Sequence, residues 1–417
     1  MKKREGNVMK TEVSRAFGRL ACIGLLLGGV GSAAAQPAAS AWPLFHGDAQ
    51  RTGRTSIVGP ANANNARIAY QGYAAFRSSP VIGPDGTVYI GTGRNLCALD
   101  PSNDTIKWCN DINSNVHLAS PAIGVDPLDP MNKVVIYQGG RDNRMHAVDQ
   151  NGVTRWTFLV GLDGDVATSA VMTASAVYFG GSVRLHAMPP NSVQPPSGNP
   201  NPIWVRPVDS PVFMANPLLS PSGNVVYVGT SGGSLYAFTA DAAGTQKWQI
   251  TVGRNIRFGA AAIGPDGTIY VGTRDGLVSV TDNGASATIN WTFPMGGRGC
   301  GSTPTIAADG TIYVGGQGAA VGAGAAFFAI AATWQPGQLP LWVYQTDKQF
   351  RGSAVLDGAG RLYTTTGHSV VALNANGNNN PVWTFTTGRN IFSSPALGAD
   401  GTLWVTGADR NLYAIPN

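Results

Sequence analysis

Short apolar runs separated by turn residues form one repeat unit, which recurs every 41 to 51 residues along the chain and ends at a tryptophan. One copy reads Ser79 to Gly83, Thr87 to Gly91, Leu96 to Asp100 and Ile106 to Trp108. Four short apolar runs in a unit of this length are typical of a β-propeller blade. The seven closing tryptophans are Trp108, Trp156, Trp204, Trp248, Trp291, Trp342 and Trp383.

The number of copies predicts how many blades the ring has. The copies begin near Phe76, His117, Val166, Phe213, Arg257, Cys300, Phe350 and Ile391. The sequence therefore predicts one all-β domain, a single eight-bladed β-propeller of four-stranded antiparallel blades. The last copy stops before its fourth strand, and the strand-like run from Arg67 to Tyr70 stands before the first copy. We expect this N-terminal strand to complete the last blade and close the ring.

The N-terminal segment has the pattern of a secretory signal peptide. Basic residues precede a short apolar run from Leu20 to Val30, and small residues end at Ala35. We therefore expect a signal peptide at residues 1–35, a leader segment at 36–65 and the propeller at 66–417. Cys22 opens the apolar run instead of following it, so we expect no lipid anchor and a periplasmic or secreted protein.

Composition narrows the possible chemistry once the signal peptide is set aside. The full chain has a formal charge of +5, but residues 1–35 hold six basic and two acidic residues, which leaves 22 basic and 21 acidic ones. A nearly neutral chain predicts no nucleic-acid binding. Both glutamates, Glu5 and Glu12, lie in the signal peptide, so a mature chain would need Asp for every carboxylate function.

Two of the three cysteines after residue 35 fall on neighbouring predicted strands. A turn at Pro101 to Asp104 lies midway between Cys97 and Cys109, so antiparallel pairing brings the two opposite each other. Export to an oxidising compartment favours a disulfide between them, although two separate half-buried thiols also fit the sequence. Cys300 is left without a partner.

The repeat resembles that of a known family, the pyrroloquinoline-quinone (PQQ)-like β-propellers. The resemblance is carried by phrases such as residues 78–91 with Ala98 to Asp100 and Trp108, and by the leader from Trp42 to Gly53. It covers residues 42–417 and implies the propeller fold. The family includes both quinoprotein dehydrogenases and non-catalytic scaffolds such as the BamB-type lipoproteins of outer-membrane protein assembly.

The two branches of the family imply different chemistry. The dehydrogenases hold the quinone at the propeller axis with Ca²⁺ or a lanthanide on Glu and Asn or Asp ligands, and many stack it on a vicinal disulfide. This chain has no Glu after residue 12 and no adjacent cysteines. The third-strand position of His146 and His186 is filled by Cys97, Tyr236, Phe328 and Tyr413 in other copies, which indicates packing. We therefore expect no catalysis, no metal and no cofactor, with a PQQ-dependent dehydrogenase as the alternative.

Charged residues gather in the loops that lead into the innermost strands. Acidic ones, Asp163, Asp165 and Asp209, lie between blades 2 and 4, whereas the basic ones lie on blades 5 to 8 and 1. Such a basic sector either binds an anionic partner or holds neighbouring loops together, and both interpretations remain open. The candidate partner-binding residues are Arg77, Arg254, Arg257, Arg298, Lys348, Arg351 and Arg389.

Together these features predict a non-catalytic exported scaffold, a monomer that binds an envelope or secreted protein, or an anionic ligand. A BamB-like role in outer-membrane protein assembly is one form of this function. A sugar-binding or adhesion module is a third possibility.

Overall fold

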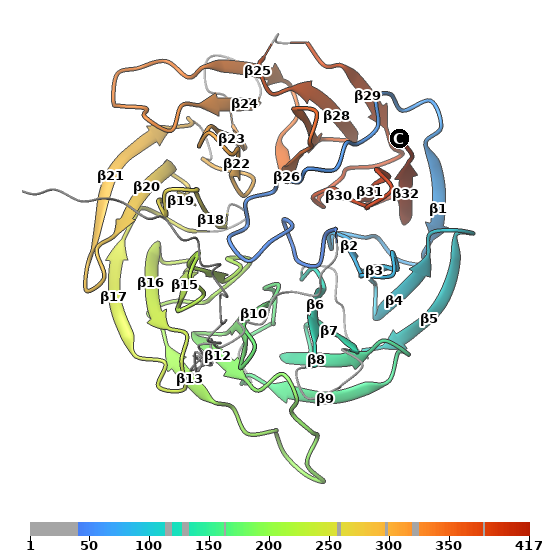
Figure 1. The fold of residues 1–417 in the computed structure, drawn as a ribbon, viewed down its shortest axis with the longest axis vertical. Coiled ribbons are helices and arrows are strands. Elements are labelled where there is room, and N and C mark those ends of the chain that lie inside the picture. Colours follow the sequence, from blue (N-terminus) through green and yellow to red (C-terminus); the bar gives the residue numbers. More distant parts are fainter. Residues whose placement is uncertain are drawn as a thin grey trace, which may run out of the picture. The chain divides into compact units, whose positions relative to one another are not determined.

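The computed structural model describes residues 41–112, 119–126, 133–161, 164–256, 260–296, 299–318, 325–377 and 380–417. These residues belong to one compact unit. Their regular elements are all strands, in eight four-stranded antiparallel sheets arranged as a ring (Figure 1). The prediction of an eight-bladed β-propeller is confirmed. The predicted signal peptide lies outside the described residues.

Blades 1 to 7 each take four consecutive strands, from the axis outwards. Blades 1 to 4 are β2 (Val81–Ile82), β3 (Val88–Thr92), β4 (Asn95–Asp100), β5 (Thr105–Asp111); β6 (Ala122–Val125), β7 (Val134–Gly139), β8 (Arg144–Asp149), β9 (Thr154–Leu159); β10 (Val171–Met172), β11 (Val177–Gly181), β12 (Arg184–Met188), β13 (Trp204–Pro207); β14 (Leu218–Leu219), β15 (Val225–Gly229), β16 (Ser234–Thr239), β17 (Gln246–Thr251).

The later blades follow the same plan. Blades 5 to 7 are β18 (Ala261–Ile263), β19 (Ile269–Gly272), β20 (Gly276–Asp282), β21 (Ala287–Pro294); β22 (Thr305–Ile306), β23 (Ile312–Gly315), β24 (Ala325–Ile330), β25 (Trp342–Thr346); β26 (Phe350–Leu356), β27 (Arg361–Thr366), β28 (Ser369–Asn374), β29 (Trp383–Thr386). Blade 8 has β30 (Ala396–Leu397), β31 (Leu403–Thr406) and β32 (Asn411–Ile415).

The N-terminal strand closes the ring. Strand β1 (Arg67–Gln71) pairs antiparallel with β32, with Ile68 opposite Tyr413, and supplies the outer strand of blade 8. The N-terminal strand is therefore bonded to the last strand of the chain, which joins the two ends of the ring within one blade.

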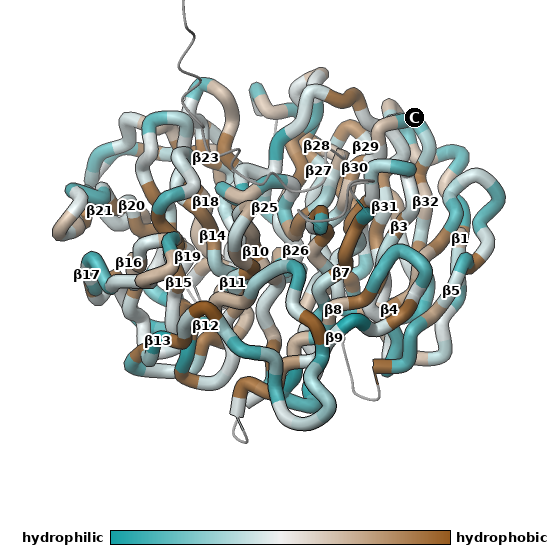
Figure 2. The backbone as a smooth tube through the Cα atoms, turned by 60° about the horizontal axis from the view of Figure 1, so that its bottom comes forward, coloured by the Kyte–Doolittle hydropathy of each residue, from teal (hydrophilic) through white to brown (hydrophobic). Residues whose placement is uncertain are grey.

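Apolar strands of neighbouring blades pack face to face to form the core. In the second strands of blades 1, 3 and 4 every residue is buried. Hydrophobic segments concentrate in the strands and hydrophilic ones in the connecting loops (Figure 2). Among the described residues no helix is long and apolar enough to cross a bilayer.

The repeated tryptophans pack within their own blade, and Trp108, Trp204, Trp248 and Trp342 also donate a hydrogen bond to the next blade. In blade 1 the rings of Tyr89 and Trp108 lie 5.9 Å apart, and blades 2 to 7 repeat this pair at 5.6 to 5.9 Å. The indole N–H of Trp108 donates to the Gln150 carbonyl of blade 2 at 2.8 Å. The tryptophan period therefore reflects blade-to-blade packing.

The leader winds once around the axis, inside the ring. Its carbonyl oxygens accept hydrogen bonds, 2.8 or 2.9 Å long, from one equivalent residue of the innermost strand in six blades, taken in chain order. The donors on blades 1, 2, 4, 5, 6 and 7 are the N–H groups of Ile82, Ile123, Leu219, Ile263, Ile306 and Leu356, and the acceptors are Trp42, Pro43, Ala49, Gln50, Thr52 and Gly53. The leader is therefore a hub to which most blades are bonded (Figure 1).

Two buried side chains fasten the hub. Arg51 is fully buried and donates to the carbonyl oxygens of Phe45 at 2.6 Å, Ala170 at 2.9 Å and Pro217 at 3.1 Å. Burial lowers the pKa of Arg51 to about 9. The ring of His46 lies 2.6 Å from the Arg51 oxygen and 2.9 Å from the Ala354 oxygen. These carbonyls favour the charged imidazole, but burial prevails and lowers the pKa of His46 to about 4.

A belt of hydrogen bonds joins neighbouring blades at the residue that stands two positions before the innermost apolar pair. In each link a backbone N–H donates to the side-chain oxygen of the equivalent residue in the next blade, at 2.7 to 3.0 Å. The links run from Ser79 to Ser120, Ser120 to Ser169, Ser169 to Asn216, Thr303 to Ser353, Ser353 to Ser394, and Ser394 back to Ser79.

The belt is interrupted at blade 5, where Ala260 occupies the equivalent position and has no side-chain acceptor. We expect Ala260→Ser to supply the missing oxygen to the Asn216 N–H and to stabilise the protein by about 1 kcal/mol. The measurement is chemical unfolding of the mature protein. Ser353→Ala, which removes an existing acceptor from the Thr303 N–H, should destabilise it by about 1–3 kcal/mol. If Ala260→Ser and Ser353→Ala change the free energy of unfolding by the same amount and in the same direction, the hydrogen bonds of the belt do not stabilise the ring.

Candidate functional site

A cavity of about 390 Å³ lies where the innermost strands begin, at the axis of the ring. The leader bounds it through Phe45, and residues from blades 1 to 4, 7 and 8 form its wall. The lining residues are Phe45, Arg77, Ser79, Ser120, Arg141, Asp165, Ala167, Ser169, Phe213, Met214, Asn216, Arg351, Ser353, Phe392 and Ser394.

Two arginines and one phenylalanine form the basic side of this cavity. The guanidinium carbons of Arg77 and Arg351 lie 4.8 and 5.1 Å from the ring centroid of Phe392. These three residues occupy the same position in the repeats of blades 1, 7 and 8, one residue before Ser78, Gly352 and Ser393. Contact with the ring face holds both guanidinium groups beside the cavity. No carboxylate of the described residues forms an ion pair with Arg77.

The serine belt also faces the cavity, as donors. Ser79, Ser120, Ser169, Ser353 and Ser394 all line it. Each of these hydroxyl oxygens already accepts a backbone N–H of the preceding blade. A hydroxyl has one proton to donate in addition, and within the described residues none of these five protons has an acceptor. The cavity is therefore rich in donors.

The opposite wall is apolar and electrically balanced. Phe213 and Met214 from blade 4 form its apolar part. Asp165 is the acidic residue that lines the cavity, and Arg141 donates to its carboxylate at 2.9 Å. Since this pair neutralises itself, the other charged side chains of the described lining are those of Arg77 and Arg351, which are both positive.

Two further hollows adjoin the axial cavity on opposite sides. One lies at blade 7 and shares Arg351 and Phe392 with the cavity, and the other lies at blade 3 and shares Asp165 and Phe213. Blades 3 and 7 are four positions apart in a ring of eight, so they face each other across the axis (Figure 1). The three hollows share lining residues and lie in a row along a diameter of the ring, and we call this row the transaxial groove.

The structure brings some of the predicted basic residues together and separates others. Arg77 and Arg351 line the axial cavity, and Lys348 lines the hollow at blade 7 beside Asp347, 2.9 Å away. Arg389 is exposed and lines none of the three hollows. Arg257 and Arg298 lie outside the described residues, as does Asp163.

Arg254 also stands apart from the groove and has a partner in its own blade. It pairs with Asp275 at 2.6 Å, and this guanidinium holds the pKa of the Asp275 carboxyl below its usual range. Asp209 accepts hydrogen bonds from Thr230 and Ser234. Arg254 and Asp209 thus show the loop-bracing arrangement that the sequence left open.

The sequence did not reveal Phe392, Phe45 or the donor role of the serines. Their signal was present in the repeat, since a Ser, Thr or Asn stands at the belt position in every blade except the fifth. Aligning the residue two positions before it would have placed Arg77, Arg351 and Phe392 in one ring.

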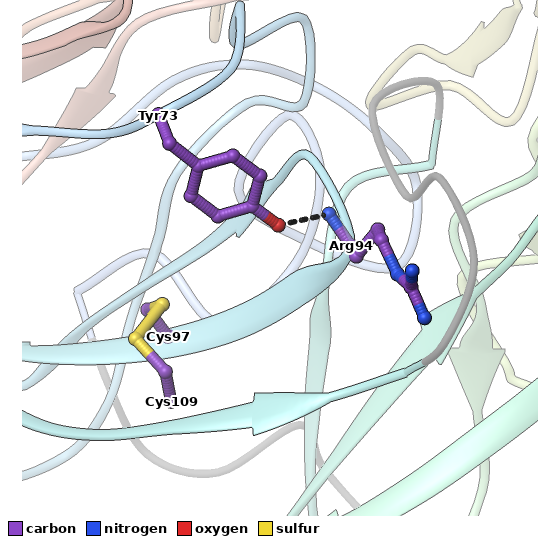
Figure 3. The surroundings of a disulfide bond; sticks show 4 residues. All are labelled: Tyr73, Arg94, Cys97 and Cys109. Carbon is purple, nitrogen blue, oxygen red and sulfur yellow. Dashed lines mark hydrogen bonds between the residues drawn. A yellow bond between two sulfur atoms is a disulfide. The ribbon is translucent and has the colours of Figure 1, made fainter.

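The histidines and cysteines take structural positions. His186 stacks on Phe179 at 5.3 Å, and burial lowers its pKa to about 4. Cys97 and Cys109 lie opposite each other on β4 and β5 and are joined by a disulfide, close to the hydrogen bond from the Arg94 N–H to the Tyr73 hydroxyl (Figure 3). Cys300 is a buried thiol whose pKa burial raises to about 12.

The donor set of the axial cavity can be compared with the needs of a Ca²⁺-bound quinone. Ca²⁺ takes six to eight oxygen ligands, usually with several carboxylates among them. Within the described part of the lining the carboxylate is that of Asp165, which is paired with Arg141. Among the described residues no three His, Cys, Asp or Glu side chains gather as a metal-binding group. Arg77 and Arg351 suit the carboxylates of such a quinone, but the lining does not fit its cation.

Comparison with known proteins places this fold among PQQ-like propellers. The family model described as outer membrane protein assembly factor BamB matches residues 49–195. No curated protein sequence matches the chain.

Similar solved structures come from both branches of the family. BamB from Moraxella catarrhalis has 16% sequence identity and a TM-score of 0.61, with 84% of this chain and 99% of that chain covered. Quinohemoprotein alcohol dehydrogenase from Comamonas testosteroni has 14% identity and a TM-score of 0.65, covering 90% and 80%. A europium-containing methanol dehydrogenase has 13% identity and a TM-score of 0.65, covering 88% and 89%.

At these identities the likeness to solved structures shows the fold alone. The matched segment 49–195 and the ring of eight blades nevertheless agree with the repeat read from the sequence. Residues 49–195 therefore match the BamB family model, and the chain has the propeller fold that is also found in BamB and in the quinohemoprotein alcohol dehydrogenase.

Proposed function

We propose that this protein is a non-catalytic scaffold, exported to the cell envelope, that binds an extended segment of a partner protein. The observation that carries this function is the transaxial groove, which crosses one face from blade 7 to blade 3. An extended segment can lie in such a groove without a change in the ring, because the leader and the belt already hold the blades together.

The similarity to BamB supports a protein partner, since both the matching family model and a similar solved structure bear that name. The dehydrogenases are as similar in fold. The choice between the two branches therefore rests on the cavity, whose lining suits an acceptor-bearing segment better than a metal-bound quinone.

Site-specific photocrosslinking tests the scaffold function. A photoreactive amino acid at Phe213, in the groove at blade 3, should give a discrete crosslinked protein in cells. The matched control is the same group at Ile289, an exposed position on the outer strand of blade 5. Identical products from both positions, or none from Phe213, would count against the groove as the binding face.

Calorimetric titration with PQQ and Ca²⁺ tests the alternative. The scaffold function predicts no saturable binding. One-to-one binding in the micromolar range or tighter, on the order of −8 kcal/mol, would overturn it in favour of a quinone-dependent dehydrogenase.

A further inference from the structure

We infer that the axial cavity receives an acidic side chain of the bound segment, so that the partner is recognised by a carboxylate held over the axis. This inference rests on the proposed function and deepens it.

The serine hydroxyls supply the hydrogen-bond donors of the cavity. Five serine hydroxyls line the cavity, and each oxygen accepts one hydrogen bond from a backbone N–H of the preceding blade. Each of these serines is at least nine-tenths buried. Their remaining O–H protons need an acceptor, and a bound group with several acceptor oxygens provides it. A carboxylate has two oxygens and about four acceptor sites.

The charge of the cavity favours an anion over a neutral acceptor. Arg77 and Arg351 flank the ring of Phe392, while Arg141 is neutralised by Asp165. The Arg77 guanidinium presents a planar set of donors that matches the geometry of a carboxylate. Arg351 donates from Nε and Nη2 to the Gln349 amide oxygen at 3.2 and 2.9 Å, so it is held beside the cavity and adds a positive charge there. An amide in the same place would satisfy some donors but would bring no negative charge to Arg77, which forms no ion pair with a carboxylate of the described residues.

The walls and the groove favour a side chain of a protein segment over an inorganic anion. Phe45, Phe213 and Met214 give the cavity an apolar surface that suits carbon atoms. The hollows at blades 7 and 3 extend the cavity in both directions, which leaves room for the chain on either side of the acidic residue. A phosphate ion would use the donors and leave these surfaces bare.

The test compares two capped peptides on the mature protein by calorimetry and NMR. One is acetyl-Thr-Val-Glu-Val-Thr-amide and the other has Gln in place of Glu, so the pair differs in charge with little change in shape. β-Branched flanks favour an extended chain. We expect the Glu peptide to bind at least about tenfold more tightly, because charge-assisted hydrogen bonds are about twice as strong as neutral ones.

Variants then place the effect in the cavity. Arg77→Gln and Arg351→Gln should each remove most of the preference for Glu, and Arg77→Lys should restore part of it. Arg254→Gln is the matched control, since this arginine is exposed and paired with Asp275 outside the groove. Thermal unfolding checks that each variant is folded.

Three results would overturn the inference. They are equal affinity for the two peptides, an unchanged preference in both cavity variants, and binding of free glutarate or inorganic phosphate without binding of the Glu peptide. If one of these results is found while the Phe213 crosslink still forms, only the carboxylate site is overturned. The proposed scaffold function then remains supported.

Discussion

Replacing Arg51 with methionine should destabilise the mature protein by about 3 kcal/mol or more. The side chain is fully buried in the leader and joins three carbonyl oxygens that belong to the leader, blade 3 and blade 4. Methionine fills similar space but leaves the oxygens of Phe45, Ala170 and Pro217 without this donor. Each buried unpaired acceptor costs about 1–3 kcal/mol, partly offset by the burial cost of the lost charge.

Urea unfolding of the wild type and the variant measures this loss. Arg54→Met is the matched control, because Arg54 also lies in the leader but is only partly buried and donates chiefly to the Ala307 oxygen at 3.0 Å. We expect the control to lose about 1 kcal/mol. If Arg51→Met stays within that range, the leader is not the hub that its hydrogen bonds indicate.

Protonation of His186 alone should lower the free energy of unfolding by about 3 kcal/mol as the pH drops from 7 to 4. Burial lowers the pKa of His186 from 6.5 to about 4. Between these two values the unfolded chain binds a proton that the folded protein does not. The contribution is therefore fully present above pH 6.5 and is lost as the pH falls towards 4.

His186→Phe should remove this part of the pH dependence. The ring already lies between Phe179 and Phe158, and its Nδ1 is buried without a hydrogen-bond partner, so phenylalanine fits the surroundings. The free energy of unfolding, measured at pH 7 and pH 4.5, should differ less in the variant than in the wild type. His46 keeps its own contribution, since burial lowers its pKa in the same direction.

An exposed histidine provides the comparison. His368 lies in the turn after β27 and is exposed, so His368→Gln should retain the wild-type slope. If the free energy of unfolding changes equally with pH in the wild type and in His186→Phe, protonation of His186 is not linked to folding.

The sequence by itself determined the architecture, because every blade must bury the same apolar runs and therefore repeats the same pattern. The positions of the tryptophans fixed the unit, and the orphan strand from Arg67 to Tyr70 predicted the closure that β1 makes with β32. The symmetric spacing about Asn103 similarly placed Cys97 opposite Cys109. These features depend on neighbours in the chain or on one repeated contact, which a linear pattern can express.

Only the tertiary structure decided what lies at the axis. Arg77, Arg351 and Phe392 are far apart in the sequence, and they meet because blades 7, 8 and 1 are adjacent once the ring is closed. The sequence grouped Arg254 and Arg389 with them by loop type, yet Arg254 turns to Asp275 within blade 5.

The leader most clearly separates what the sequence predicts from what the tertiary structure decides. Its phrase from Trp42 to Gly53 was recognisable, but its path depends on six blades presenting an N–H to the axis at one level. Closure of the ring creates that circle of donors, and no single repeat contains it. The sequence therefore determined the blades, and the packing of the blades around the leader decided the site.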